Sequence, residues 1–112
     1  MTREEVAQAA MALPAATRIV LWDRLDVYKV GGKVFASCGD GEGLSFKASE
    51  IAYAVLTEDG PGRPAPGFAR GRWVNLPLAD CAAWEVTEWL AASHTLAAES
   101  LGRAVRRELG LG

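Results

Sequence analysis

The sequence has few of the side chains that build metal sites and nucleophilic catalysts. It contains a single histidine, His94, and two cysteines, Cys38 and Cys81, which stand far apart and form no CxxC pair. A structural zinc site takes about four Cys or His ligands, so we expect no zinc site and no other cofactor. Two distant cysteines favour reduced thiols over a disulfide framework, which predicts a cytoplasmic protein.

Long apolar runs and an excess of positive charge are also missing. No apolar run approaches the ~20 residues of a transmembrane helix, so we expect no membrane partner. Glu4 and Glu5 stand where a signal peptide would carry positive charge. Twelve basic and fourteen acidic residues give a net charge of -2, which argues against strong non-specific nucleic-acid binding. Any contact with nucleic acid would therefore need a local basic patch.

The composition that is present supports one folded domain. The chain has 112 residues, half of them hydrophobic, with four tryptophans. This length is typical of a single domain, and the apolar share is large enough for a core. We therefore expect residues 1–112 to fold as one unit.

The first half of the sequence predicts a helix followed by strands. Thr2 and Glu5 form a T-x-x-E capping box that starts a helix, and Pro14 cannot continue it. Short β-branched segments joined by glycine turns then predict an antiparallel meander. Its strands are expected at residues 27–30, 33–37 and 44–47, after a further extended segment at 18–22.

The second half predicts helices around one more strand. Ser49 has the character of an N-cap, and residues 59–67, with three prolines and three glycines, predict a loop. A strand at 73–76 follows, then a helix capped by Asp80 and a last helix over 94–109. The whole pattern predicts an α+β fold in the order α-β-β-β-α-β-α-α. An antiparallel sheet of four to five strands would carry helices packed on one face.

Five short segments in order carry a resemblance to a known family. They are VGGKVFA at 30–36, LSFK at 44–47, PGF at 66–68, RGRWV at 70–74 and ASH at 92–94. Together they make nearly the whole chain similar to the MmcQ/YjbR family. The resemblance implies a frataxin-like (CyaY-like) α+β fold. Family members are commonly described as DNA-binding proteins with a double-wing motif, and the resemblance implies no catalytic residues.

Ser93 and His94 are adjacent, but their spacing does not suit catalysis. Neighbouring residues on a helix point about 100° apart, so the two are poorly placed as nucleophile and base. We expect Ser93 to cap the last helix and His94 to be a surface residue or a residue of the helix start. The frataxin-like fold also raises the question of iron, which frataxins bind on an acidic ridge of the first helix. Here that helix offers only Glu4 and Glu5, so we expect no iron site.

A basic surface with aromatic residues is the best candidate for a binding site. If Leu44 and Phe46 face the helices, alternation places the polar strand residues on the open face. Arginines in and beside the loop have no acidic residue between them, which suits phosphate contact and base stacking. Alternatively, these residues have structural roles and bind nothing. Phe35 and Trp73 would then lie in the core, Lys47 would have its hydrogen bonds satisfied at the end of its strand, and the arginines would be solvated in the loop. The candidate DNA-binding residues are Lys33, Lys47, Arg63, Arg70, Arg72, Trp73 and Asn75.

The sequence is compatible with two functions. The first is a small non-enzymatic cytoplasmic module that binds DNA through the basic loop and the sheet face. The second is an adaptor domain that binds a protein or a ligand on the exposed sheet face, because tryptophan is enriched at interfaces. No residue pair indicates an acid–base catalyst, so we expect no enzymatic activity. A contiguous positive strip would favour DNA, and a mixed surface would favour the adaptor.

Overall fold

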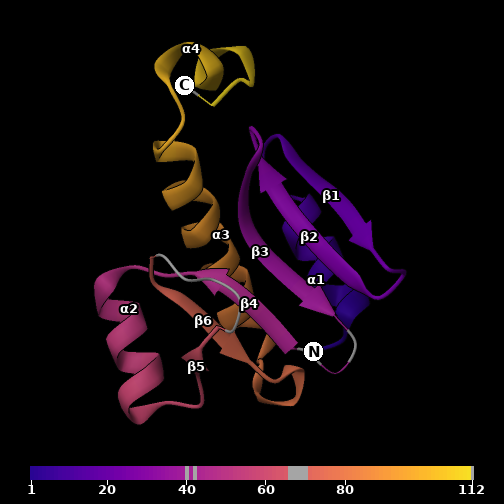
Figure 1. Ribbon diagram of the computed structural model, residues 1–112, viewed down its shortest axis with the longest axis vertical. Helices are drawn as coiled ribbons and strands as arrows, with labels where there is room; N and C mark the ends of the chain where they lie inside the picture. The colour runs from indigo at the N-terminus through magenta and orange to yellow at the C-terminus, as the bar shows by residue number, and fades with distance from the viewer. Residues whose placement is uncertain (40, 42, 66–70, 112) are drawn as a thin grey trace.

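The computed structural model describes residues 1–39, 41, 43–65 and 71–111, and Figure 1 shows their arrangement. Four α-helices and six β-strands make up the described fold. In chain order they are α1 (Arg3–Met11), β1 (Ala16–Leu21), β2 (Leu25–Val30), β3 (Lys33–Gly39), β4 (Gly43–Lys47), α2 (Glu50–Ala54), β5 (Arg63–Pro64), β6 (Trp73–Leu76), α3 (Ala83–Glu99) and α4 (Arg103–Glu108). A π-helical turn, Val55–Asp59, extends α2, and a 3₁₀ turn, Leu78–Asp80, precedes α3.

The six strands form one antiparallel sheet in the order β1-β2-β3-β4-β6-β5. This confirms that residues 27–30, 33–37, 44–47 and 73–76 share one sheet. The prediction of four to five strands was too low. The strand over 16–21 extends the meander, and the two-residue β5 lies in the proline- and glycine-rich segment, where no alternation marks a strand.

Helices α1 and α3 pack side by side on the same face of the sheet (Figure 1). Helix α3 crosses β2, β3 and β4, while α1 covers β1 to β3. The indole of Trp89 in α3 stacks on Phe46 of β4, with ring centroids 5.3 Å apart. The largest fully buried apolar side chains between sheet and helices are those of Val6, Tyr28, Val30, Phe35, Cys38, Leu44, Phe46, Val74, Leu76, Val86 and Leu90.

A bulge in β3 changes which side chains face the helices. Tyr28 pairs with Ala36 and Lys29 pairs with Val34, so Phe35 is an extra residue without a partner on β2. Both Phe35 and Ala36 are buried, and the Phe35 ring meets the edge of His94 in α3 at 5.4 Å. The alternation of β3 therefore reverses between Lys33 and Ala36. Sequence alternation alone does not reveal this reversal.

The helix starts and ends agree with the sequence in the first half and differ in the second. The capping box of Thr2 and Glu5 is present, and Ser49 caps α2. The last two helices were wrongly divided, because α3 continues through residue 94 to Glu99. The break lies instead at residues 100–102, where Gly102 is the N-cap of α4. Asp80 lies in the 3₁₀ turn and does not cap α3.

None of the described helices is long and apolar enough to cross a membrane.

Candidate functional site

Four of the predicted DNA-binding residues lie together on the sheet face opposite α1 and α3. Lys47 pairs with Trp73, and Asn75 pairs with Ser45 on one side and Arg63 on the other. Paired residues of antiparallel strands project from the same face. The Asn75 amide donates to Ser45 Oγ at 3.0 Å, and Arg63 Nε donates to Asn75 Oδ1 at 3.2 Å.

Two of these residues are too deeply buried to contact a ligand. Trp73 is 9% exposed and Asn75 is 3% exposed, so neither presents a surface for base stacking or base reading. This agrees with the alternative in which Trp73 is a packing residue. The exposed sheet aromatics expected for an adaptor are therefore not found at Trp73.

The other predicted residues are dispersed or outside the described part. Arg72 is exposed beside Trp73. Lys33 pairs with Val30, whose side chain is buried on the helix side, so the bulge separates Lys33 from the face that carries Lys47. Arg70 lies outside the described residues. The structure thus groups Lys47, Arg63 and Arg72 near one end of the sheet and leaves Lys33 apart.

The basic character of this sheet face is nevertheless clear. Lys29 joins Lys47 and Arg63 there, because it pairs with Thr17 and Val34 and alternates with the buried Tyr28. Among the described strand residues the only carboxylate belongs to Asp26, which points to the helix side. The described strands therefore present basic groups and no acidic group on this face.

Asp26 is the centre of a buried ion cluster that the sequence reasoning missed. Its side chain is fully buried and receives paired hydrogen bonds from two arginines. Arg3 of α1 donates at 2.9 and 3.0 Å, and Arg18 of β1 donates at 3.1 and 2.8 Å. The sequence signal was an aspartate that alternates with the apolar-facing Tyr28 and Val30 along one strand, a position that points inward with them.

The cluster shifts the pKa values of its members. Hydrogen bonds from Arg3 and then Arg18 hold the pKa of Asp26 below its usual value, although burial acts in the opposite direction. Burial raises the pKa of Tyr28, and the negative charge of Asp26 adds to this effect. Because the carboxylate is fully enclosed, its chemistry is structural: it ties α1 to β1 and β2.

Ser93 and His94 are buried and do not form a catalytic pair. The Ser93 hydroxyl lies 2.5 Å from the carbonyl of Lys47 and 2.8 Å from that of Trp89. His94 Nε2 lies 2.7 Å from the carbonyl of Pro14. The expected roles of a helix cap and a surface histidine were wrong. Both side chains instead tie the middle of α3 to distant parts of the chain, and the Ser93 hydroxyl also bonds back to the Trp89 carbonyl within the helix.

No cluster of three or more His, Cys, Asp or Glu side chains suited to a metal ion occurs in the described ranges. Cys38 and Cys81 are both buried, and no disulfide joins them.

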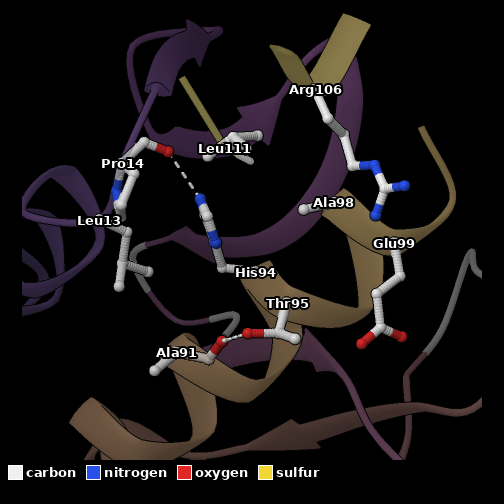
Figure 2. Close-up of a pocket in the computed structure, with 9 residues that line it drawn as sticks. All are labelled: Leu13, Pro14, Ala91, His94, Thr95, Ala98, Glu99, Arg106 and Leu111. Carbon is white, nitrogen blue, oxygen red and sulfur yellow. Dashed lines mark hydrogen bonds between the residues drawn. The ribbon is translucent and has the colours of Figure 1, made fainter. Parts of the chain in front are cut away.

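A cavity of about 340 Å³ lies beside His94, where the C-terminal half of α3 meets α4 and the segment after α1 (Figure 2). Polar groups reach it from α3 and α4, and the remaining wall is apolar. Within the described part of the chain, Nε of Arg106 is the one buried side-chain nitrogen or oxygen without a hydrogen-bond partner. The lining residues are Leu13, Pro14, Ala91, His94, Thr95, Ala98, Glu99, Arg106 and Leu111.

A second exposed feature is the outer edge of β1. This strand ends the sheet, and no described strand pairs with its free side. Ile19, Val20 and Leu21 are all exposed, and Trp22, directly after the strand, is 78% exposed. Trp22 and Asp23 both have positive φ, 52° and 58°, in a turn closed by a 3.1 Å bond from Arg24 N–H to the Leu21 carbonyl.

Comparisons with known proteins agree with this architecture. The family model of YjbR matches residues 11–96. The chain therefore belongs to the YjbR family. A crystal structure of Deinococcus radiodurans protein DR2400, which has a DUF419 domain, superposes with a TM-score of 0.82 at 24% identity, covering 99% of this chain and 89% of that one. That likeness concerns the fold. No curated protein shows significant similarity to the sequence.

Proposed function

We propose that the chain is a non-enzymatic protein-interaction module that adds an extended strand of a partner protein to the free edge of β1. The observation that carries the proposal is an unprotected apolar edge. Natural proteins usually protect edge strands with lysine, proline or a bulge, because free backbone groups recruit other strands. Strand β1 contains neither lysine nor proline, and its one charged residue, Arg18, is bound to Asp26.

The residue type at position 22 supports the same proposal. A turn with two positive φ angles favours Asn or Gly, because a Cβ is strained in the left-handed region. Tryptophan has no such preference, and at 78% exposure it gains little from packing. Neither the backbone nor the core therefore explains Trp22. A role in a contact with another protein does, since tryptophan is enriched among the residues that dominate interfaces.

The experiment selects strand-like peptides from a displayed library and measures their affinity by fluorescence anisotropy. The variant Ile19→Lys/Leu21→Lys places two lysines on one exposed side of β1. The matched control Ile51→Lys/Val55→Lys changes two exposed apolar residues, one in α2 and one in the π-helical turn that extends it. We expect the first to abolish binding and the second to retain it. Equal loss in both variants, or a failure to select any peptide, would refute the proposal. If the wild type dimerises in a concentration-dependent way and the first variant does not, the partner at the β1 edge would be a second copy of this chain and not another protein.

DNA binding is the second candidate, and the acid-free basic face of the strands is the observation that favours it. Duplex DNA would contact Arg63, Arg72 and Lys47 through phosphates, since Trp73 and Asn75 are enclosed. If the chain binds DNA, we propose that it does so in the double-wing mode and that its fold is CyaY-like in detail.

We also propose that the protein has no catalytic activity and acts in the cytoplasm. The support for the first is the engagement of Ser93 and His94 with backbone carbonyls. The support for the second is that no disulfide joins the two buried cysteines. Assays of hydrolase and transferase activity on the purified chain, and fractionation of cells expressing it, would test the two statements.

A further inference from the structure

We propose that the strand added at the free edge of β1 carries a glutamate, whose carboxylate pairs with the guanidinium of Arg18 and thereby sets the register of that strand. This inference rests on the proposed function and names the chemistry of the partner. The starting observation is that Arg18 binds Asp26 with only part of its guanidinium. Its Nε and Nη2 both donate to Oδ1 of Asp26, at 3.1 and 2.8 Å. Among the described residues none accepts a hydrogen bond from Nη1, so the two N–H donors of that nitrogen remain for a partner.

The register of β1 on β2 decides which partner side chains can reach Arg18. Arg18 pairs with the buried Tyr28, and Val20 pairs with Asp26, so both side chains project to the helix side of the sheet. Ile19 lies between them and projects to the opposite face. Every second residue of an added strand therefore lies on the helix side, and one of these residues lies directly opposite Arg18.

The helix side of β1 is open at this position. The carboxylate of Asp26 is fully enclosed, whereas the side chain of Arg18 keeps 36% of its exposure. Val20, two residues along on the same side, is 45% exposed, so this part of the strand is not fully covered. The hydrogen bond to Asp26 raises the pKa of Arg18, and the guanidinium stays charged. A strand added about 4.8 Å from β1 would therefore place its own side chains beside an exposed positive charge.

The distance that a partner side chain must span favours glutamate. The guanidinium of Arg18 reaches toward Asp26 on β2, and so it leans away from the free edge. A carboxylate on the added strand must extend across β1 to meet it, and a glutamate side chain is longer than that of aspartate by one methylene group. A basic side chain at the same position would instead meet like charge, because Arg3 also donates to Asp26, at 2.9 and 3.0 Å. Like charges placed opposite each other destabilise strand pairing.

A single charged position on β1 also specifies the alignment of the added strand. The described sheet is antiparallel throughout, so an antiparallel strand continues it. A slip of one residue would move the glutamate to the opposite face, and a slip of two would place it beside Ala16 or Val20, which are apolar. In the proposed register, the residues one and three positions before the glutamate lie opposite Ile19 and Leu21. Apolar side chains suit these two positions, since Ile19 and Leu21 are exposed apolar residues.

The test is an NMR titration of the ¹⁵N-labelled chain with end-blocked peptides of the sequence VTVEVT and with its glutamine and lysine forms at the fourth position. We expect all shifted amides to cluster in β1, and the glutamine form to bind about three- to fivefold more weakly, the ratio for one partly exposed charge pair. The lysine form should bind more weakly still. The net charge of the chain is -2, so a bulk charge effect would favour the lysine form, and a preference for glutamate must be local. Added salt should weaken the glutamate peptide and not the glutamine peptide.

Variants of the chain assign the preference to Arg18. Arg18→Gln should bind the glutamate and glutamine peptides equally, and because both affinities are measured on the same variant, their ratio does not depend on its stability. Val20→Glu keeps Arg18 and places a carboxylate two residues away on the same side of β1, where it competes for the guanidinium. It should also bring the ratio close to one, whereas the matched control Val20→Gln should retain the wild-type ratio.

The outcomes separate this inference from the proposed function. Shifts in β1 with equal affinity for the glutamate and glutamine peptides would overturn the role of Arg18 and leave the edge as a binding site. Tighter binding of the lysine form, or a preference for glutamate that survives in both Arg18→Gln and Val20→Glu, would overturn it in the same way. The absence of shifts in β1 with every peptide would count against the edge itself, and with it against both proposals.

Discussion

The Asp26 cluster gives the sharpest prediction about the stability of this domain. The change Asp26→Asn keeps the shape of the side chain and removes its charge. Removing one partner of a buried ion pair costs about 3–5 kcal/mol, because it leaves the other charge unpaired. The side chains of Arg3 and Arg18 keep 21% and 36% of their exposure, so water can partly solvate them in the variant. We therefore expect a loss of about 2–4 kcal/mol in the free energy of unfolding at pH 7.

Urea denaturation followed by tryptophan fluorescence measures this loss. With a slope of about 1.5 kcal/mol per molar urea, the midpoint should fall by about 2 M. The matched control is Asp23→Asn, an exposed aspartate in the neighbouring turn, where Asn tolerates the positive φ equally well. The free energy of unfolding of this control should stay within about 0.5 kcal/mol of the wild-type value. A loss below about 1 kcal/mol for Asp26→Asn would refute the reasoning.

The pH dependence follows from the direction of the pKa shift. Because the pKa of Asp26 is lower in the folded chain than its ordinary value of 3.8, its charge stabilises the fold above that value. This stabilisation is lost as the pH falls through the lower, folded pKa. The difference between wild type and Asp26→Asn should thus be constant from pH 7 to about pH 5 and shrink below about pH 4. A difference that grows on acidification would contradict the assigned direction.

Three further predictions concern the tryptophans and arginines. Trp89→Ala should cost about 3–5 kcal/mol, because Trp89 stacks on Phe46, whereas the exposed Trp84→Ala on the same helix should cost below about 1 kcal/mol; denaturant midpoints decide between them. Trp22→Asn should change the free energy of unfolding by less than about 1 kcal/mol, because Asn tolerates the left-handed backbone and Trp22 buries little surface. The same variant should weaken peptide binding at β1 in anisotropy assays. If DNA is bound, Arg63→Ala/Arg72→Ala should lower the slope of log K against log salt by about two, whereas Arg103→Ala/Arg107→Ala on α4 should leave the slope unchanged. Wild-type binding weaker than about 100 μM at low salt would refute DNA binding.

The sheet was predictable because its signals are local. Glycine turns and β-branched runs marked β2, β3, β4 and β6, and the capping side chains of Thr2 and Ser49 marked two helix starts. The join between the last helices was not predictable by the same means. Ser93 carries the sequence character of a cap, but the carbonyl of Lys47, which fixes it inside α3, is supplied by a strand far away in the chain.

The candidate sites depended even more on distant contacts. A single unpaired residue, Phe35, reverses the alternation of β3 and moves Lys33 away from Lys47, so the face assigned to Lys33 from period-two alternation is wrong, while the faces of β4 and β6 are as alternation predicts. The cavity joins Pro14 to His94 and Arg106, and nothing local at any of these positions indicates the others. Trp22 is the exception. A tryptophan where the turn favours Asn or Gly conflicts with local backbone preference, and such a conflict is visible in the sequence once the hairpin is assigned. Because fold stability does not explain that residue, the turn at the end of β1 is the position at which replacing one side chain should separate stability from binding.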